Sequence, residues 1–360
     1  MKTARIGVIG GGKFGEMHLR AFRQLENEGK ARLAALADVN EKLLADREKQ
    51  YGVKPYTDYL QMIEKEKLDG VSVATPDFLH RKIAVDCLKA GAHVLVEKPL
   101  DTTIAGCREM IAAAEKKKVI LQVDFHKRYD PYHQELEKFA RAGKFGRIQY
   151  GYSWMEDRIE VPRDWFPQWA PKSSPGWFLG VHFYDLVRWI IQSNGREVFA
   201  TGMKDKLKSL GVDTYDSICA MVVFENGATF CFETSWILPD GFEAIVNQGI
   251  RIVGSEGIME VDSQNRGAES CFAGAGMATH NLGFFKETKD KDGRTVYSGY
   301  GIESIQDWAL NVNFLLNGGK LADLKGKYAD GHDGLEVTKI AVAVHKSVET
   351  GKAVKLKDLG

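Results

Sequence analysis

The sequence lacks the features that mark secreted, membrane-bound and nucleic-acid-binding proteins. It has five cysteines, an odd number without a C-x-x-C pair, which argues against a disulfide framework or a zinc site and for a reducing compartment. No apolar run approaches the ~18 residues that a membrane-spanning helix needs. The 49 basic and 49 acidic side chains cancel, so the charge balance favours neither nucleic acid nor an anionic membrane as partner. The first predicted strand begins by Ala4 or Arg5, which leaves no room for a signal peptide. We therefore expect a cytoplasmic protein.

The length and the pattern of apolar runs indicate two domains. At about 150 residues per domain, 360 residues suggest about two. Up to Val123, short apolar runs alternate with helical runs, and this alternation is typical of parallel βαβ units. In this part of the chain, strands are predicted at 5–9, 33–37, 71–75, 93–96 and 119–123, and helices at 16–25, 57–66 and 78–90.

Beyond Asp124 the pattern changes to helices and to strands with period-two alternation. Here helices are predicted at 131–142, 176–193, 303–316 and 333–350, and strands at 217–225, 228–236, 249–253 and 258–261. Asn226-Gly227 is a hairpin signal between two of these strands. Residues 265–300 are either a long loop or a pair of short strands. A run of strands after βα units predicts a second, α+β domain.

We therefore expect an α/β protein with two domains. Residues 1–123 would form an N-terminal Rossmann domain, a doubly wound parallel sheet that binds NAD. Residues 124–360 would form a C-terminal α+β domain with an open, mostly antiparallel sheet, which binds substrate and forms the oligomer. Because an open apolar sheet face must be covered, we expect a homodimer or homotetramer.

The most informative segment is the glycine-rich turn Gly10–Gly15, which follows an apolar strand and precedes a helical run. In a G-x-G-x-x-G turn, Gly10 permits the tight bend, Gly12 lets the main chain approach a pyrophosphate, and Gly15 lets helix and strand pack closely. The amides at the helix start favour a phosphate. Asp38 ends the next strand, 23 residues after Gly15. It can accept both ribose hydroxyls of NAD and would repel the 2′-phosphate of NADP, so NAD is the expected cofactor and NADP is less favoured.

Further motifs follow in order along the chain. They are Pro76-Asp-Phe-Leu-His80 after the strand 71–75, Glu97-Lys98-Pro99 after the strand 93–96, Arg128-Tyr-Asp-Pro131, Gly180-Val-His182-Phe-Tyr-Asp185, and the late segments 252–257 and 333–351. With the glycine turn they resemble the Gfo/Idh/MocA family of nicotinamide-dependent sugar and polyol oxidoreductases. The resemblance covers nearly the whole chain, and its specific part is Glu97-Lys98-Pro99 with His182 downstream.

This resemblance implies roles for individual residues. As catalytic residues, Lys98 would stabilise the developing oxyanion, His182 would take the hydroxyl proton, and Asp185 would be the partner of His182. The implied cofactor-binding residues are Gly10, Gly12, Phe14, Gly15, Asp38, Thr75, Pro76, His80, Glu97 and Lys98. The predicted substrate contacts are Arg128, Trp154, Trp165 and Trp169, the tryptophans because aromatic faces suit the C–H faces of a sugar ring. No metal is expected, because a lysine and a histidine can do the acid–base work.

Each predicted residue also has a structural alternative. Lys98 could be a surface lysine, His182 a packed residue of an apolar helix, and Asp185 a local cap. Arg128 either binds substrate or packs under the domain hinge. The tryptophans could instead pack the second domain or an oligomer contact.

The chain departs from the family pattern at Phe178, where many members have Asp four residues before the histidine. On a regular helix Phe178, His182 and Asp185 share one face, so an acid at 178 would hold the histidine in one tautomer. Without it, Asp185 is the nearest local candidate for that role.

The resemblance favours NAD-dependent interconversion of a secondary hydroxyl and a ketone on a sugar, an inositol or a sugar derivative. One alternative is transient oxidation that enables glycoside cleavage with NAD recycled. Another is a non-catalytic sensor that binds the dinucleotide to regulate a partner. The expected partner is therefore a small carbohydrate or polyol, without nucleic acid or membrane.

Overall fold

Residues 2–360 are described by the computed structural model, and the chain divides into two units that are each built around one large β-sheet. Unit 1 contains the residues up to Asp130 and Gly283–Leu335, and unit 2 contains Pro131–Leu282 and Glu336–Gly360. None of the helices within residues 2–360 is long and apolar enough to cross a bilayer.

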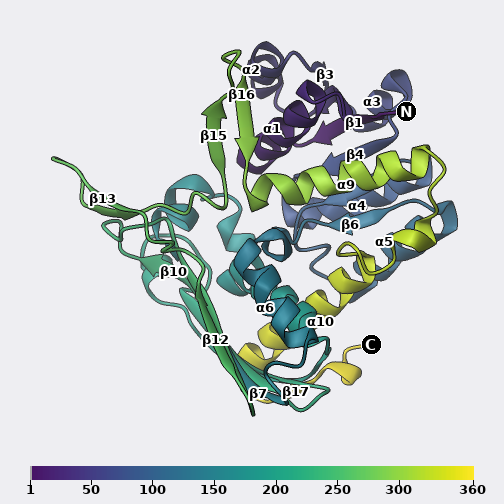
Figure 1. Ribbon diagram of the computed structural model, residues 1–360. Coiled ribbons are helices and arrows are strands. Elements are labelled where there is room, and N and C mark those ends of the chain that lie inside the picture. Colours follow the sequence, from purple (N-terminus) through teal and green to yellow (C-terminus); the bar gives the residue numbers. More distant parts are fainter. Residues whose placement is uncertain (1) are drawn as a thin grey trace. The chain divides into compact units, whose positions relative to one another are not determined.

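Unit 1 holds the predicted Rossmann sheet, which is parallel throughout and ordered β3-β2-β1-β4-β5-β6 (Figure 1). Its strands are β1 (Ala4–Ile9), β2 (Ala31–Ala37), β3 (Lys54–Tyr56), β4 (Gly70–Val73), β5 (His93–Val96) and β6 (Leu121–Val123). Its helices are α1 (Lys13–Asn27), α2 (Glu41–Tyr51), α3 (Tyr59–Glu66), α4 (Asp77–Ala90), α5 (Ile104–Lys117), α9 (Tyr300–Leu316), and the 3₁₀ turns η1 (His126–Tyr129) and η5 (Leu321–Leu324). The central strands are apolar and almost entirely buried, as expected of a sheet covered on both faces.

Side-chain caps fix where several of these helices begin. Asn40, Asp58 and Thr103 each accept a hydrogen bond from a main-chain amide in the first turn of α2, α3 and α5, respectively. The first helix differs, because the residue before α1, Gly12, offers no side-chain cap. No side-chain cap therefore competes with a phosphate for the first amides of α1.

One segment departs from the expected domain boundary at residues 123 and 124, because Gly283–Leu335 packs with unit 1. The helix α9 carries Trp308, which is fully buried and lies against Phe22 of α1 with ring centroids 5.8 Å apart. Asp307 of the same helix accepts a 2.7 Å hydrogen bond from the hydroxyl of Tyr129. The apolar face of α9 that carries Trp308 has to be buried, and the Rossmann unit supplies the surface that covers it.

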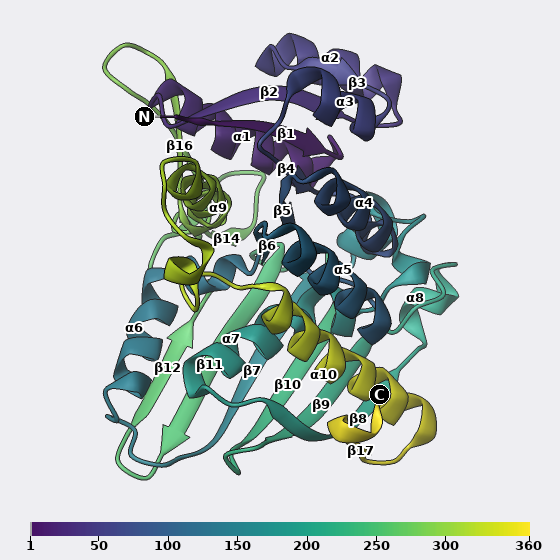
Figure 2. The same ribbon diagram turned by 90° about the vertical axis from the view of Figure 1, so that its right-hand side faces the viewer.

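Unit 2 contains the predicted mostly antiparallel sheet, ordered β12-β11-β7-β10-β9-β8-β17, in which only β7 and β10 pair in parallel. Its strands are β7 (Ile148–Arg158), β8 (Gly195–Met203), β9 (Ser217–Phe224), β10 (Thr229–Leu238), β11 (Val246–Gly254), β12 (Ile258–Asp262) and β17 (Val354–Lys355). Its helices are α6 (Pro131–Arg141), α7 (Val181–Ile191), α8 (Lys206–Ser209) and most of α10 (Gly331–Thr350), with 3₁₀ turns η3 (Ala170–Lys172) and η6 (Leu356–Asp358). Figure 2 shows α6, α7 and α10 along one face of this sheet.

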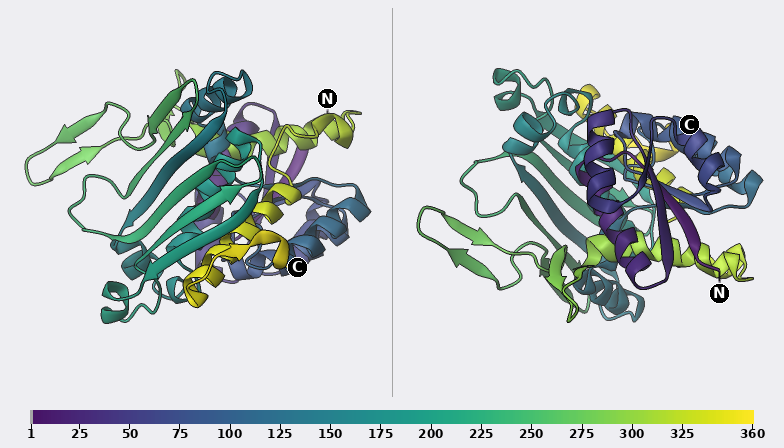
Figure 3. Two further views of the ribbon diagram at one scale, coloured as in Figure 1. Left: turned by 90° about the horizontal axis from the view of Figure 1, so that it is seen from below. Right: turned by 90° about the horizontal axis from the view of Figure 1, so that it is seen from above.

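The opposite face of the unit 2 sheet is exposed. Alternate residues of β9 and β10 are buried, as the period-two pattern predicts. The residues between them form a row across the sheet in which each pairs with the next, namely Phe199, Met221, Cys231, Tyr152, Arg251 and Glu260. Phe199 and Met221 are 42% and 43% exposed. Figure 3 (left panel) shows these strands from the side away from the helices.

Two stretches differ from the predicted elements. The single helix expected over 176–193 is instead a π-helical turn, η4 (Gly176–Gly180), followed by α7. Another π-helical turn, η2 (Val161–Trp165), follows β7. The region 265–300 contains two short hairpins rather than a long loop or one strand pair. They are formed by β13 (Glu269–Cys271) with β14 (Met277–Thr279), and by β15 (Lys286–Lys289) with β16 (Thr295–Ser298).

Candidate functional site

The glycine turn of unit 1 has the geometry that a pyrophosphate needs. Gly10 has a positive φ of 94°, and a side chain at Gly15 would overlap the carbonyl oxygen of Gly10. At Gly12, by contrast, a Cβ would meet nothing within 4 Å. Gly10 and Gly15 therefore allow the turn to form, whereas Gly12 leaves the approach to the uncapped start of α1 open. These features fit the diphosphate of a dinucleotide.

Asp38 lies at the end of β2, next to the glycine turn. Its carboxylate accepts hydrogen bonds from the amide of Gly11 at 2.7 Å and from the amide of Asn40 at 2.8 Å. A carboxylate has further acceptor sites, so these two contacts orient Asp38 and still leave capacity for ribose hydroxyls.

Arg47 is a neighbour of the glycine turn that the sequence did not point to. Its Nε donates to the Gly11 carbonyl oxygen at 3.1 Å, and its guanidinium forms a 2.6 Å ion pair with Glu16 of α1. It belongs to α2 and has no fixed spacing from the glycines, so only the folded chain brings it there. Because Glu16 already balances the charge of Arg47, the main role of Arg47 is to hold the glycine turn in place.

His80 connects the loops that follow β4 and β5. Its ring is fully buried, with Nε2 2.9 Å from the carbonyl oxygen of Thr75 and Nδ1 2.8 Å from that of Pro99. A neutral imidazole can donate only one of these two bonds, and an imidazolium can donate both. His80 therefore holds Thr75-Pro76 and Lys98-Pro99, the latter joined by a cis peptide, at the same edge of the sheet.

Lys98 is a largely buried lysine, with 7% of its surface exposed. Its ammonium lies over the ring of Phe14, 5.8 Å from the ring centroid. Phe14 belongs to the first turn of α1 and is 39% exposed. The predicted catalytic lysine thus lies beside the predicted cofactor-binding turn, and the surface-lysine alternative does not describe it.

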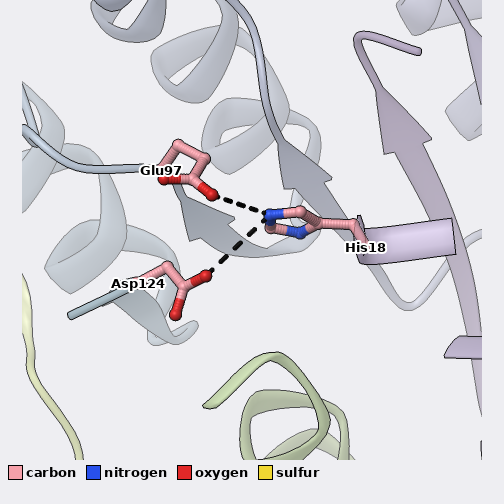
Figure 4. Close-up of side chains that lie close together, drawn as sticks. All are labelled: His18, Glu97 and Asp124. Carbon is pink, nitrogen blue, oxygen red and sulfur yellow. Dashed lines mark hydrogen bonds and ion pairs between the residues drawn. The ribbon is translucent and has the colours of Figure 1, made fainter. Parts of the chain in front are cut away.

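Three ionisable side chains, one of them that of Glu97 next to Lys98 in the chain, lie close together (Figure 4). His18 Nε2 lies 3.1 Å from Glu97 Oε1 and 3.9 Å from Asp124 Oδ2. Their side chains are 0%, 12% and 3% exposed, respectively. Within residues 2–360 this is the one group of at least three His, Cys, Asp or Glu side chains whose potential ligand atoms all lie within 4.8 Å of one another. The sequence did not single out His18 or Asp124, because neither belongs to a motif with a known spacing.

The pKa values of the two carboxyls of this cluster are shifted in opposite directions. Burial favours the neutral acid and, together with the charge of Glu97, raises the pKa of Asp124 to about 7. Burial also raises the pKa of Glu97, but the hydrogen bond with His18 and the positive charge of Lys98 outweigh it and lower that pKa overall. Glu97 is therefore the ionised member of the pair, and Asp124 is the one that carries the proton.

Arg128, the predicted substrate contact of unit 1, is engaged in structural contacts. It forms a 3.2 Å ion pair with Asp333, and its guanidinium lies 6.0 Å from the centroid of the Phe125 ring. These contacts favour the packing alternative for Arg128, and a substrate contact stays a prediction.

In unit 2, His182 and Asp185 both lie on α7 and are buried, with 4% and 0% of their surface exposed. They are three positions apart, which places them on one side of the helix. The π-helical turn η4 precedes them, so Phe178 is not in register with His182 as a continuous α-helix would require. π-Helical turns within helices occur frequently at functional sites.

Phe178 belongs to an aromatic cluster. Its ring centroid lies 5.2 Å from Trp169, 5.8 Å from Trp236 and 6.2 Å from Phe166. The position at which many family members have an acid is therefore apolar and packed. The same contacts favour the alternative for Trp169, in which it packs the second domain rather than binding substrate.

The other two predicted tryptophans lie elsewhere in unit 2. Trp154 of β7 stacks on Tyr152 with centroids 5.8 Å apart, and its Nε1 donates to Asn247. Trp165, at the end of η2, is 38% exposed. Of the three, Trp165 presents the most accessible ring to a ligand, and all three substrate contacts stay predictions.

Comparison with known proteins agrees with these features. The family described as "Oxidoreductase family, NAD-binding Rossmann fold" matches residues 4–125, and the "GFO/IDH/MocA C-terminal domain" matches residues 133–260. The myo-inositol 2-dehydrogenase of Thermotoga maritima is 28% identical over 361 residues, which cover 99% of each chain. The D-apiose dehydrogenase of Paraburkholderia graminis is 24% identical over 369 residues, 100% of this chain and 91% of that protein.

Among solved structures, scyllo-inositol dehydrogenase from Lactobacillus casei with bound NAD(H) and scyllo-inositol has the same fold. The TM-score is 0.77 at 19% identity, with 99% of this chain and 100% of that chain covered.

The neutral state of Asp124 predicts a pH-dependent stability. The pKa of this carboxyl is about 7 in the folded chain against an ordinary value of 3.8, so the folded state binds its proton more tightly and stability is lost as the pH rises from about 4 to about 7. Asp124→Asn cannot ionise and should escape this loss, which is on the order of 4 kcal/mol at most. Urea unfolding of both proteins at about pH 4.5 and about pH 8 measures the difference. The exposed Asp292→Asn is the control, and parallel pH dependence of Asp124→Asn and the unaltered chain would contradict the prediction.

Proposed function

The chain belongs to the Gfo/Idh/MocA family of NAD-binding oxidoreductases, and we propose that it converts a secondary hydroxyl of a cyclic polyol or sugar to a ketone, or catalyses the reverse reduction. The inositol and apiose dehydrogenases among its full-length relatives support a substrate of this class. Bound NAD would supply the hydride acceptor, and the protein would supply orientation and electrostatics.

The strongest structural support for this function is the position of the Lys98 ammonium. It lies over Phe14 in the first turn of the cofactor-binding helix. A buried positive charge next to the glycine turn is suited to an oxygen that becomes an alkoxide as hydride leaves its carbon. Lys98 would hold this oxygen and stabilise its charge. Glu97 would keep the main chain of Lys98 in place, because its Oε2 accepts the Lys98 amide hydrogen bond at 3.2 Å.

His182 is proposed as the group that takes the hydroxyl proton. Its imidazole is buried on α7 with Asp185 one turn away on the same side. A histidine exchanges protons near neutral pH, and a nearby carboxylate would stabilise the imidazolium formed by that transfer.

The choice of NAD over NADP is assigned to Asp38. Its carboxylate is oriented by Gly11 and Asn40 at the end of β2. A fixed negative charge there suits two ribose hydroxyls and opposes a phosphate.

We also propose that the exposed sheet face of unit 2 joins two copies of the chain. The row from Phe199 to Glu260 combines apolar side chains at one end with Arg251 and Glu260 at the other. A two-fold interface brings the same surface of both copies together, so it would cover the exposed apolar side chains of Phe199 and Met221.

The reaction class is tested by supplying polyols, inositols, aldoses, glycosides and nucleotide sugars with NAD and following the NADH absorbance. Turnover of a cyclic polyol or sugar supports the proposal. Tight binding of NADH without turnover of any member of the panel would instead favour a sensor.

Lys98→Met should reduce kcat by at least ~100-fold, the scale of losing one oxyanion-stabilising group, while the Kd of NADH changes much less. Stopped-flow turnover and NADH fluorescence titration measure the two quantities. The exposed Lys116→Met is the matched control, and a folded Lys98→Met with near-normal kcat would remove Lys98 from the mechanism.

His182→Ala should lower kcat for oxidation by ~100- to 10,000-fold, the usual range for a positioned general base. It should also abolish the rise of the rate with pH that the histidine causes. Asp185→Asn should move this rise to lower pH, since losing a negative charge disfavours the imidazolium. His280→Ala, an exposed histidine of the same unit, is the control. A pH–rate profile that stays unchanged in His182→Ala would assign the proton transfer to another group.

The chain should prefer NAD to NADP, and Asp38→Ala should erode that preference by removing the charge that opposes the 2′-phosphate. The ratio of kcat/KM for the two cofactors measures it. Glu41→Ala, which removes an exposed acid from the start of α2, controls for charge alone. Equal use of NADP by the unaltered chain would refute the assignment.

The unaltered chain should be a dimer or tetramer in solution, and Met221→Glu should shift it to smaller species by placing charge in the apolar end of the row. Sedimentation velocity measures the mass. Leu310→Glu, at an exposed leucine of α9 in unit 1, should leave the mass unchanged. A monomeric unaltered chain would contradict the proposal.

A further inference from the structure

The carboxylate of Glu97 connects two parts of unit 1 that are distant in the sequence. Its Oε1 lies 3.1 Å from Nε2 of His18 in α1, and its Oε2 accepts the main-chain amide hydrogen bond of Lys98 at 3.2 Å. Glu97 is buried and its pKa is lowered by the bond with His18, so the donor on His18 is needed to compensate an ionised, desolvated group. Without that donor the carboxylate would have to turn or take up a proton.

The tautomer of His18 follows from its surroundings. Nε2 has carboxyl oxygens of Glu97 and Asp124 at 3.1 and 3.9 Å, whereas Nδ1 is buried and meets no hydrogen-bonding atom of residues 2–360. A proton on Nδ1 would be a buried donor without an acceptor. The ring therefore carries a proton on Nε2 and donates it to Glu97.

His18 is held rigidly in the helix that begins at the glycine turn. It is the sixth residue of α1, is 0% exposed and packs against Phe22 one turn later, with ring centroids 6.3 Å apart. The first turn of the same helix carries Phe14, whose ring faces the Lys98 ammonium. α1 thus contacts both parts of Lys98: Phe14 lies against its ammonium, and His18 is linked through Glu97 to its main-chain amide.

The remaining groups around the cluster add charge. Asp124 comes from the end of β6 and flanks the same nitrogen of His18. Lys98 and His126 of η1 contribute positive charge, and Ser304 of α9 lies beside Asp124. The His18–Glu97 bond is therefore a contact through which α1 can fix the loop after β5, in addition to that of Phe14 with Lys98.

We propose that His18 is a positioning residue for Lys98: it acts through Glu97 to hold the Lys98 main chain at a fixed place relative to the cofactor-binding helix. The inference rests on the proposed function of Lys98. The catalytic lysine and the glycine turn would then be parts of one rigid assembly. Loss of the His18–Glu97 bond would misplace Lys98 and lower the rate without weakening NAD binding.

The test compares His18→Gln with His18→Asn. The glutamine amide nitrogen can reach the position of Nε2 and donate to Glu97, whereas the asparagine amide is too short to do so. His18→Asn should lower kcat by ~10- to 100-fold, the scale of a misplaced catalytic group, with the Kd of NADH changed by less than about threefold. His18→Gln should restore kcat to within about threefold of the unaltered chain. His332→Gln, at an exposed His–Glu pair of the same unit, should have no effect.

A double-variant cycle distinguishes positioning from a general loss of structure. If His18 acts through Lys98, His18→Asn should cost less than about twofold in a Lys98→Met background. Thermal unfolding identifies any variant that does not fold, and the Gln variant still tests the proposal if Asn does not. Equal turnover of folded Gln and Asn variants, whether normal or slow, would overturn it, as would a full, additive loss in the double variant.

These results separate the inference from the proposed function. Normal turnover in Lys98→Met would end both. Slow turnover in Lys98→Met combined with normal turnover in both His18 variants would end the positioning role of His18 alone.

Discussion

The placement of an ionised carboxylate in the interior of unit 1 is the constraint on which the predicted site depends. Glu97 follows β5 directly and is nearly enclosed, so each of its oxygens needs a donor. One donor is a side chain of α1 and the other is the main chain of Lys98. Because both must be in place at the same time, the helix that begins at the glycine turn and the loop that carries the lysine cannot shift independently.

Much of the fold could be predicted from the sequence because the relevant signals are local. The glycine turn between a strand and a helix, and the alternation of βα units, define the Rossmann sheet. Period-two alternation around Asn226-Gly227 predicts the hairpin of the second sheet. The positions of Lys98 and Asp38 at the carboxyl ends of strands follow from the same reasoning.

What could not be predicted depends on contacts between distant residues. His18, Asp124 and Arg47 acquire their surroundings only when α1, β6 and α2 are brought together, and no spacing in the sequence records this. The π-helical turn before His182 was missed for a related reason, since the apolar pattern of 176–193 is compatible with a continuous helix. The aromatic contacts of Phe178 give a reason for the local distortion, because they hold that side chain in a cluster with Trp169 and Trp236.

The return of Gly283–Leu335 to unit 1 also affects the order in which the chain can fold during synthesis. The core around Phe22 stays open until α9 supplies Trp308, although Phe22 leaves the ribosome long before Trp308. Unit 2 likewise waits for α10 and β17 at the end of the chain. Unit 1 therefore cannot close its core until α9 is made, and unit 2 cannot until α10 and β17 are made, so the nascent chain exposes apolar surface through much of its synthesis.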